Sequence, residues 1–560
     1  MDRYLRIQQS IVKFRKTIMA YNSMKRYWQK AIFIAISILI ITPAGIHAQE
    51  SVQKNQLKFG RLLRLINSYY VDTANVEKLT ENAVIHLLGE LDPHSVYISE
   101  EDVKKMNEPL QGKFEGIGIS FNIFKDTLLV TTTISGGPSE KVGLRAGDRI
   151  IEVDGENIAG IGLKNTDVMD LLRGDKGTTV EIKVLRRSAE EPLDFKIVRD
   201  KIPIYSLDAS YMLDEETGYI KLNKFSATTT DEFTDAITEL KQNQNVQNLI
   251  LDLRGNGGGY LKTAIEISDQ FLKNDQLIVY TEGLNEPTRE YDATSKGVFE
   301  NGNLVVLIDE GSASASEIVS GAVQDWDRGL IMGRRSFGKG LVQKPYFLTD
   351  GSVVRLTTAH YHTPSGRSIQ KPYEEGVEEY RKDYLERLNA GELFSADSIS
   401  FADSLKYKTL LNERTVFGGG GIMPDIFIPM DTSSNFRYYN RLRRNQVVYN
   451  FVLDYVDQNR KELKNNYPEF DQFYTNFEVN QAMVDTIVAK GEEEGIEKDG
   501  ESLAFTLNDM KREVKALIAR DLYSRDDFYK ILYSDDDAII KALQVIRNQQ
   551  EYNNLLVSAH

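Results

Sequence analysis

The sequence predicts a multidomain α/β protein, and three observations support this fold class. The middle of the chain repeats a unit in which a buried strand ends in a glycine or serine turn and leads into a helix. Short strands punctuated by glycine precede this repeat, and apolar residues at helical spacing mark both ends. At 560 residues the chain is too long for one hydrophobic core, so several domains are expected.

The composition excludes several classes of function. A formal net charge of -15 disfavours a nucleic-acid binder, whose phosphate contacts need a basic face. The absence of cysteine excludes disulfides, thiolate catalysis and cysteine-bound zinc. The six histidines are scattered and form no HExxH pair, so we expect no metal site.

Residues 1–48 are predicted to be an export signal. The apolar run at 31–41, AIFIAISILII, is shorter than the ~20 residues of a membrane span, and basic residues precede it. Ala48 offers a cleavage point before Gln49, and translation from Met24 would give a basic segment of ordinary length. We therefore expect a periplasmic protein; the alternative is an uncleaved anchor in the inner membrane.

Two regions precede the repeating core. Residues 49–112 show helical spacing, interrupted at 91–98 by the turn LDPHSVYI, in which His94 is expected to be structural. Residues 113–201 form short strands, and their segment GGPSEKVGLRAGDRIIEVDG resembles a PDZ domain. In such domains a peptide adds to a sheet edge while a glycine-bearing loop receives its terminal carboxylate. The loop that matches is Gly116, Ile117, Gly118 and Ile119.

The predicted α/β core spans 202–432. The segment QNLILDLRGNGGGY reads as a buried strand with a glycine turn, and GNLVVLIDEGSASASEIVSGAVQDW repeats the design with a serine turn. Both turns should lie at the carboxyl ends of strands, where sites in α/β sheets gather. Residues 433–560 are predicted to be a helical accessory region without recognisable chemistry.

Three serines share the second turn, and a nucleophilic serine would need a base. All three could instead be turn and capping residues, with Ser316 as the helix N-cap. The candidate bases are His360, His362 and a lysine kept neutral by burial, for which Lys339 has apolar neighbours. The surrounding GRRSFGKG at 333–340 is similar to a phosphate-binding loop, but a glycine stands where that loop needs Ser or Thr.

The motifs GSASASEI, GRRSFGKGLVQ, YHTPSGRSIQ and GGGIMPDI together resemble the carboxyl-terminal processing peptidases of the S41 family over residues 53–429. The resemblance implies Ser314 as nucleophile and Lys339, 25 positions later, as base. Gln343 matches the glutamine that orients the lysine, and strand alternation would put both side chains on one face. Ala315 matches one oxyanion donor, and the glycine turn supplies the other, with Gly257 and Gly258 as candidates.

The resemblance implies an α/β serine peptidase core carrying a PDZ domain. Such an enzyme would be an exported endopeptidase that hydrolyses proteins recognised by apolar C-terminal tails, through an acyl-enzyme and without a cofactor. Arg173 would couple tail binding to the active state. Expected partners are protein substrates, an adaptor and further copies of the chain bound through the helical ends. The alternatives are a noncatalytic PDZ adaptor or chaperone and a Ser-His esterase using His360 or His362.

The chain departs from the family pattern at 371–417. This charged, helical stretch intervenes before the GGGIMPDI motif, and it is expected to be a surface insertion.

Overall fold

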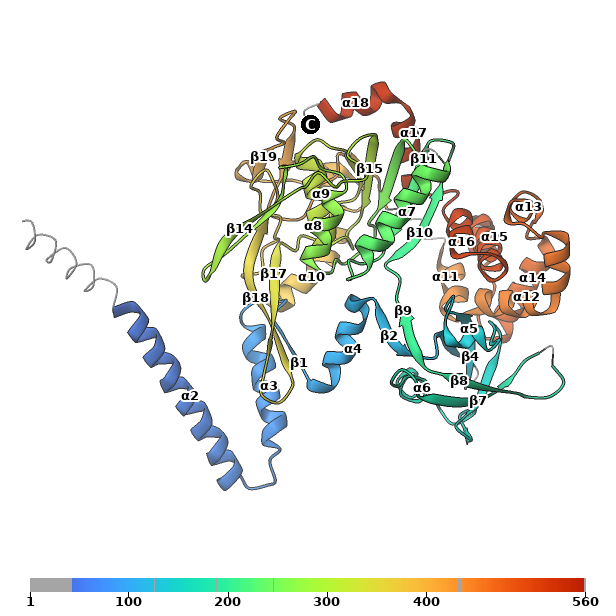
Figure 1. Ribbon diagram of the computed structural model, residues 1–560, viewed down its shortest axis with the longest axis horizontal. Helices are drawn as coiled ribbons and strands as arrows, with labels where there is room; N and C mark the ends of the chain where they lie inside the picture. Colours follow the sequence, from blue (N-terminus) through green and yellow to red (C-terminus); the bar gives the residue numbers. More distant parts are fainter. Residues whose placement is uncertain (1–42, 125, 188, 245, 431–435, 558–560) are drawn as a thin grey trace, which may run out of the picture. The chain divides into compact units, whose positions relative to one another are not determined.

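The computed structural model describes residues 43–124, 126–187, 189–244, 246–430 and 436–557 (Figure 1). It divides into two compact units, one ending at Leu87 and one beginning at Leu88. The apolar run at 31–41 and Met24 lie outside the described residues. Among the helices that are described, none combines the length and hydrophobicity needed to span a membrane.

The first unit is helical, as predicted. It contains α2 (Pro43–Tyr69) and most of α3 (Val76–Gly89). Several large apolar side chains of α2 are exposed, including Leu57, Leu62 and Leu65. Apolar residues exposed at helical spacing commonly mark a surface that associates with another chain.

The second unit begins with the segment that was predicted to be a turn at 91–98. Its first half is a turn, but its second half is strand β1 (Val96–Ile98), which pairs antiparallel with β18 (Val353–His362). Helix α4 (Glu100–Gln111) follows; Ser99 caps its start and Gly112, with a φ of 72°, ends it. This segment is therefore built into the second unit.

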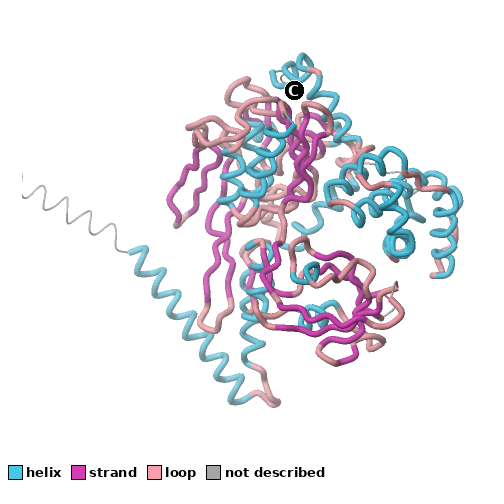
Figure 2. The backbone as a smooth tube through the Cα atoms, turned by 45° about the vertical axis from the view of Figure 1, so that its right-hand side comes forward, coloured by secondary structure: helices cyan, strands magenta, loops and turns pink. Residues whose placement is uncertain are grey.

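A small β-domain follows (Figure 2). Its antiparallel sheet has the order β3-β4-β5-β7-β8, so β3 is an edge strand. Residues such as Leu128, Ile150 and Val184 alternate into one core, closed by helix α6. The strands and helices are β2 (Lys113–Gly116), β3 (Ile119–Phe124), β4 (Thr127–Thr133), α5 (Pro138–Lys141), β5 (Arg149–Val153), β6 (Glu156–Asn157), α6 (Asn165–Leu172), β7 (Thr179–Leu185), β8 (Leu193–Val198) and β9 (Asp200–Pro203).

The α/β core is built on a six-stranded sheet of order β10-β11-β12-β15-β16-β21, in which all neighbours except β10 and β11 are parallel. Its apolar strand sequences, such as NLVVLI, bury side chains on both faces, as central strands of parallel sheets do. The strands are β10 (Leu207–Met212), β11 (Thr217–Leu222), β12 (Asn248–Asp252), β15 (Asn303–Ile308), β16 (Leu330–Gly333) and β21 (Ile426–Phe427).

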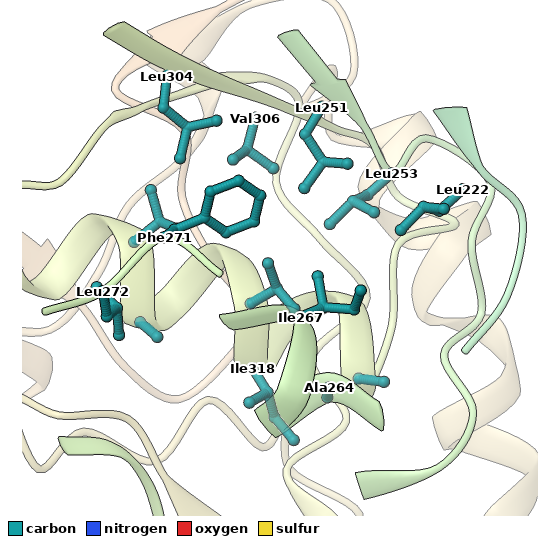
Figure 3. Close-up of a cluster of buried hydrophobic side chains, with 14 of the residues drawn as sticks. Leu222, Leu251, Leu253, Ala264, Ile267, Phe271, Leu272, Leu304, Val306 and Ile318 are labelled. Atoms are coloured by element: carbon teal, nitrogen blue, oxygen red, sulfur yellow. The ribbon is translucent and has the colours of Figure 1, made fainter. Parts of the chain in front are cut away.

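Two groups of helices cover the two faces of this sheet. On one face, Leu251 and Val306 pack against Ile267 and Phe271 of the α8 segment (Figure 3). The helices of this layer are α7 (Thr229–Gln244), α8 (Leu261–Asp269) and α9 (Ala315–Asp325). The alternate residues Ile250, Val305 and Leu307 face the opposite way and pack against α17 (Asp537–Arg547) and α18 (Gln549–Val557).

This second layer corrects the prediction that residues 433–560 are only an accessory region. Helices α17 and α18 complete the α/β core, because the apolar stripe of DAIIKALQVI is buried on the sheet. A separate helical domain with its own core precedes them. It comprises α11 (Arg437–Arg444), α12 (Val447–Asn466), α13 (Phe470–Asn476), α14 (Gln481–Glu493), α15 (Gly500–Leu522) and α16 (Arg525–Leu532).

A second sheet flanks the core in the order β1-β18-β13-β14, with β17 also paired to β18. Its remaining strands are β13 (Leu277–Gly283), β14 (Glu286–Asp292) and β17 (Leu341–Phe347). Because β18 pairs with β1, β13 and β17, it joins the segment before the small β-domain to the core.

The stretch 371–417 is not the surface insertion that was predicted. It contains α10 (Val377–Asn389), two short 3-10 turns and the hairpin β19 (Lys406–Lys408) and β20 (Thr415–Phe417). Arg414 is fully buried between Asp327 and Asp425, at 2.7 Å and 2.6 Å. Buried arginine needs such paired partners, so these charges tie the stretch into the core.

Candidate active site

A cavity of about 440 Å³ lies at the carboxyl ends of β12 and β15. The loop before β17, strand β18 and helix α4 complete its wall. Six of the residues singled out in the sequence line it: Gly257, Gly258, Ser314, Ala315, Lys339 and Gln343. Residues distant in sequence thus meet where the topology of a parallel sheet favours a site.

The three serines of the SASAS run have different surroundings. Ser312 and Ser316 are fully buried, and their hydroxyls donate to the carbonyl oxygens of Leu253 (2.9 Å) and Asn256 (2.7 Å). Ser314 is half-buried and lines the cavity. The outer two serines hold the turn together, and Ser314 is the one that faces an open space.

Ser314, and not Ser316 as the sequence suggested, is the N-cap of α9. Its φ of 55° and ψ of -109° are sparsely populated for a residue other than glycine, and such strain typically costs about 1–3 kcal/mol. The next residue, Ala315, begins the helix, so its N–H has no acceptor within the helix. This geometry brings an amide and the positive helix end to the Ser314 side chain.

Lys339 lies in the loop between β16 and β17 and is flanked by apolar residues. Burial, followed by the nearby Arg355 guanidinium, lowers the pKa of Lys339 from 10.5 to about 8. Within the described residues, its amine forms no ion pair and no hydrogen bond joins it to the Ser314 hydroxyl. With this pKa, about a tenth of the amine is neutral at pH 7 and about half at pH 8, so a neutral base is available.

A buried carboxylate that sequence reasoning missed connects the two loops. Glu317 accepts hydrogen bonds from the backbone N–H groups of Ser314 (2.7 Å), Gly338 (2.7 Å) and Lys339 (2.9 Å). It also accepts from the Ser336 hydroxyl at 2.5 Å. Burial raises the pKa of Glu317 to about 7 against the opposing effect of these donors. Its one sequence signal was its place in the first turn of α9.

Tyr361 on β18 strengthens the same connection. Its buried hydroxyl lies 2.7 Å from the carbonyl oxygen of Lys339 and 3.1 Å from that of Ser314, and it can donate to either. The backbones around Ser314 and Lys339 are thus held by one carboxylate and one hydroxyl.

Gln343 lines the cavity, but not for the reason predicted. Lys339 precedes β17, and a register shift falls between Val342 and Gln343, so no uninterrupted alternation relates the two side chains. The Gln343 amide nitrogen donates to the Thr357 hydroxyl at 3.3 Å, which donates to Asp92 at 3.0 Å. Gln343 is therefore braced by the turn that precedes β1.

His94 belongs to this same turn. Asp92 accepts the backbone N–H groups of His94 (2.8 Å) and Ser95 (2.9 Å) and the Ser95 hydroxyl. The His94 ring hydrogen-bonds the Tyr380 hydroxyl at 2.9 Å, and burial, followed by Lys339, lowers its pKa to about 4. These contacts are those of a structural histidine.

The glycine turn after β12 approaches the nucleophile closely. A Cβ on Gly258 would lie 2.7 Å from the carbonyl oxygen of Ala313 and 3.0 Å from the Ala315 nitrogen, and the φ of Gly258 is 98°. The Gly258 N–H donates to the Asn256 side chain at 2.9 Å. Gly257 and Gly258 were the two predicted oxyanion donors. Gly257, which is exposed, is therefore the one whose N–H is not already donated to an acceptor within this turn.

Neither histidine of β18 lines the cavity. His360 is exposed, while His362 stacks on Tyr280 and lies 3.1 Å from Glu282. The phosphate-loop pattern also lacks its structural context, because strand β17, not a helix, follows Lys339.

The segment α10 braces the loop that carries Lys339. Arg387 donates to the carbonyl oxygens of Ser336 (3.1 Å) and Arg335 (2.7 Å), and Glu392 pairs with both Arg387 and Arg335. Tyr380 packs edge-on against Phe337. No sequence pattern predicted this role, because charged residues of a helix are usually solvated.

The predicted peptide-binding residues lie in the small β-domain. Gly116 ends β2, Ile117 and Gly118 form the connection, and Ile119 begins the edge strand β3. Arg173, which ends α6, pairs with Glu108 of α4 at 2.5 Å and lies over the Phe114 ring. Since α4 lines the cavity through residues such as Met106 and Leu110, Arg173 connects the β-domain to the cavity wall.

Family models match three parts of the chain. Peptidase family S41 matches residues 216–379, the PDZ domain matches 129–186, and a family of unknown function, DUF8443, matches 438–524. Ser314, Lys339 and Gln343 all lie in the range that matches the peptidase family.

The chain is also similar to individual proteases. It is 34% identical over 348 residues to the carboxy-terminal-processing protease of Bartonella bacilliformis, covering 61% of this chain and 79% of that protein. It is 34% identical over 335 residues to the carboxy-terminal processing protease CtpB of Bacillus subtilis, covering 59% and 68%. The structure of the photosystem II D1 C-terminal processing protease shares 30% identity, covers 56% of this chain and 90% of that one, and has a TM-score of 0.33.

Proposed function

The chain belongs to peptidase family S41 as a carboxy-terminal processing serine protease, and from this premise we propose that it is an exported endopeptidase using a Ser314–Lys339 dyad. One observation carries the proposal: Ser314 is the serine of its turn that faces the cavity, and the lysine on the same wall has a pKa of about 8. Nucleophilic serine chemistry with a lysine base needs that combination.

The reaction proceeds through an acyl-enzyme. Neutral Lys339 takes the proton of the Ser314 hydroxyl as Oγ attacks the scissile carbonyl carbon. The N–H groups of Ala315 and Gly257 donate to the resulting oxyanion, with the helix end adding positive potential. Lys339 then protonates the leaving amine. In the second half, Lys339 deprotonates a water that attacks the acyl carbon, and Ser314 leaves as the alcohol once it regains the proton.

Gln343 is the positioning residue for the base. Because its amide nitrogen donates to Thr357, its Oε1 is the atom that can accept a hydrogen bond from the Lys339 amine. The Ser314 and Lys339 side chains close their remaining gap when substrate is bound, since catalytic hydrogen bonds are often long in the free enzyme.

The PDZ domain selects the substrate. An apolar C-terminal tail adds as a strand to the free edge of β3, and the loop Gly116–Ile119 receives its carboxylate. When a tail is bound to the PDZ domain, Arg173 transmits this state to α4, and hence to the cavity wall, through its ion pair with Glu108.

Export and assembly complete the proposal. The signal at 1–48 directs the chain to the periplasm, with Gln49 as the mature N-terminus or with the apolar run kept as an anchor. The exposed apolar residues of α2 associate with further copies of the chain, and an adaptor delivers some substrates.

The decisive experiment uses protein beginning at Gln49 and a loosely folded reporter with an apolar C-terminal tail. Fragments are identified by mass spectrometry for the parent, Ser314→Ala, Lys339→Ala and the matched control Lys344→Ala, whose amine pairs with Glu286 outside the cavity. We expect cleavage by the parent and the control, and none by the two dyad variants. Cleavage that survives Ser314→Ala would reject the nucleophile, and an amidated tail that is cut equally well would reject carboxylate capture.

A further inference from the structure

Arg355 is a charged residue of the cavity that the proposed mechanism does not use. It lies on β18, between Pro345 of β17 and Val96 of β1, and its side chain lines the cavity together with Ser314 and Lys339. Its Nε is buried and has no hydrogen-bond partner within the described residues. Arg355 as a whole is half-buried, but a buried N–H of a charged side chain without a partner is costly, so this group in a cavity points to a ligand.

The two carboxylates whose charges act on the neighbouring Lys339 already accept several hydrogen bonds. Glu317 accepts four hydrogen bonds from the two loops of the site. Asp92 accepts from the backbone of the 91–98 turn and from Thr357. No ion pair to Arg355 is formed in the part of the chain that the structure describes, and burial lowers its pKa with no carboxylate opposing that effect. Arg355 is therefore not held by a structural counter-ion.

Most of the remaining lining side chains are apolar, with uncharged polar exceptions such as Asn107 and Gln343. The apolar side chains include Ile98, Val103, Met106, Leu261 and Phe347, and Lys339 and Arg355 are the charged residues among those that line the cavity. A largely apolar cavity that holds the Arg355 guanidinium and no carboxylate among its lining residues favours an anion. A planar guanidinium binds a carboxylate through two parallel hydrogen bonds, which gives geometric specificity as well as affinity.

We propose that Arg355 binds a carboxylate of the substrate close to the scissile bond, and that this contact is a determinant of where the chain cuts. The carboxylate is either an Asp or Glu side chain or the free terminus of a short segment beyond the cleavage point. This inference rests on the proposed function and adds a subsite to it. It is separate from tail capture, which takes place on β3.

The test measures whether the enzyme prefers substrates with a carboxylate near the scissile bond. Purified protein beginning at Gln49 digests a library of peptides, and the residues around each cleavage point are counted by mass spectrometry. A peptide cut in this library is then made with Glu or Gln at the enriched position, and each form carries a free or an amidated C-terminus. A preference for Glu over Gln identifies the side chain as the ligand, and a preference for the free over the amidated form identifies the terminus.

We expect the parent to favour the carboxylate form by about tenfold in kcat/KM, as for one charge-assisted contact. Arg355→Gln should abolish the preference and Arg355→Lys should keep part of it. No preference in the parent, or an equal preference in Arg355→Gln, would overturn the proposal. A variant that lowers the cleavage of all forms equally would show that Arg355 acts only on the fold or on Lys339.

Two controls keep this outcome separate from that of the proposed function. Cleavage of the Gln peptide must disappear in Ser314→Ala; if it persists, the dyad fails and the subsite is still measurable. If Arg355→Gln cuts neither peptide, fluorescence anisotropy compares the binding of both peptides to Ser314→Ala and to Ser314→Ala/Arg355→Gln. Loss of the Glu preference in the second protein supports the proposal, and its retention rejects it.

Discussion

Two lysines that are largely shielded from solvent, the half-buried Lys339 before β17 and the buried Lys371 before α10, show what separates a base from a structural charge. Lys371 pairs with Asp383 at 2.9 Å and lies 4.1 Å from the ring centres of Phe337 and Tyr380. Lys339 has neither kind of partner and lies on the cavity wall. Burial lowers the pKa of both amines. At Lys371 a direct hydrogen bond to Asp383 opposes this effect, whereas at Lys339 only the charges of Glu317 and Asp92 oppose it, without a hydrogen bond. A missing counter-ion, more than burial alone, prepares a lysine to act as a base.

The largest expected effect concerns activity. Lys339→Met should lower kcat/KM on the tail-bearing reporter by about 10²–10⁴-fold, the range for loss of a general base. Lys371→Met should lower it by less than about tenfold, because that amine stabilises the fold around Phe337. Steady-state cleavage of the reporter measures both, with Lys344→Met as a control expected to match the parent. Equal losses of kcat/KM in Lys339→Met and Lys371→Met would contradict the assignment of Lys339 as the base and of Lys371 as a structural charge.

Glu317 connects the loop that carries Lys339 to the turn that carries Ser314. The second largest expected effect is the loss of stability when Glu317 is replaced. Glu317→Gln replaces one acceptor oxygen by a donor that faces N–H groups, so the free energy of unfolding should fall by about 3 kcal/mol. Denaturant unfolding measures this change. Glu310→Gln is the matched control; it breaks a more exposed pair with Arg334 and should cost less than about 1 kcal/mol. A Glu317→Gln protein as stable as the parent would contradict the proposed connection.

The two lysines should also respond to substitution with opposite signs in stability. The unfolded chain holds the Lys339 proton up to a pKa of 10.5, whereas the folded chain releases it at about 8, so the unfolded state binds more protons between these values. Below pH 8 this difference destabilises the fold in full, and it is relieved as the pH rises from 8 to 10.5. At pH 7, Lys339→Met should therefore stabilise the fold by about 1–3 kcal/mol.

Lys371→Met should destabilise the fold at the same pH, because it leaves Asp383 without its partner. Parallel urea unfolding of both variants at pH 7 and pH 10 measures the signs. The gain from Lys339→Met should shrink at pH 10, and a gain that does not depend on pH would mean that it comes from packing.

Part of the fold and of the candidate site could be predicted from the sequence. The strand-turn-helix repeats and the helical ends follow from local periodicity, and the resemblance to the S41 peptidases and to PDZ domains implied Ser314, Lys339 and the small β-domain. Glu317 was missed because its donors at 336–339 come from another part of the chain. The stretch 371–417, which contains Arg387 and Arg414, was predicted to lie on the surface for the same reason. An amphipathic stripe such as that of α17 says that one face is buried, but not that it covers the peptidase sheet.

The pH dependence of cleavage should reflect the base. Since protonated Lys339 cannot accept the Ser314 proton, kcat/KM should rise about tenfold per pH unit below about 8 and level off above. Arg355→Gln should move this limb to higher pH, because the guanidinium lowers the pKa of Lys339. A limb from Glu317, whose pKa is about 7, would stay in place in Arg355→Gln, because Arg355 is not among the groups that shift that pKa. A limb near 6.5 that stays in place in Arg355→Gln would instead indicate a histidine base.

The smallest expected effect tests how the PDZ domain reaches the cavity. Arg173→Met and Glu108→Gln should each lower kcat/KM about fivefold on the tail-bearing reporter, and the double variant should lose no more than either, because one ion pair is broken in all three. A short peptide without the apolar tail should be cut equally by all four proteins, since it does not occupy β3. Equal losses on both substrates would mean that the ion pair supports only the position of α4. Additive losses on the reporter would mean that Arg173 and Glu108 act through different partners, and Phe114 beneath the guanidinium would then be the next residue to replace.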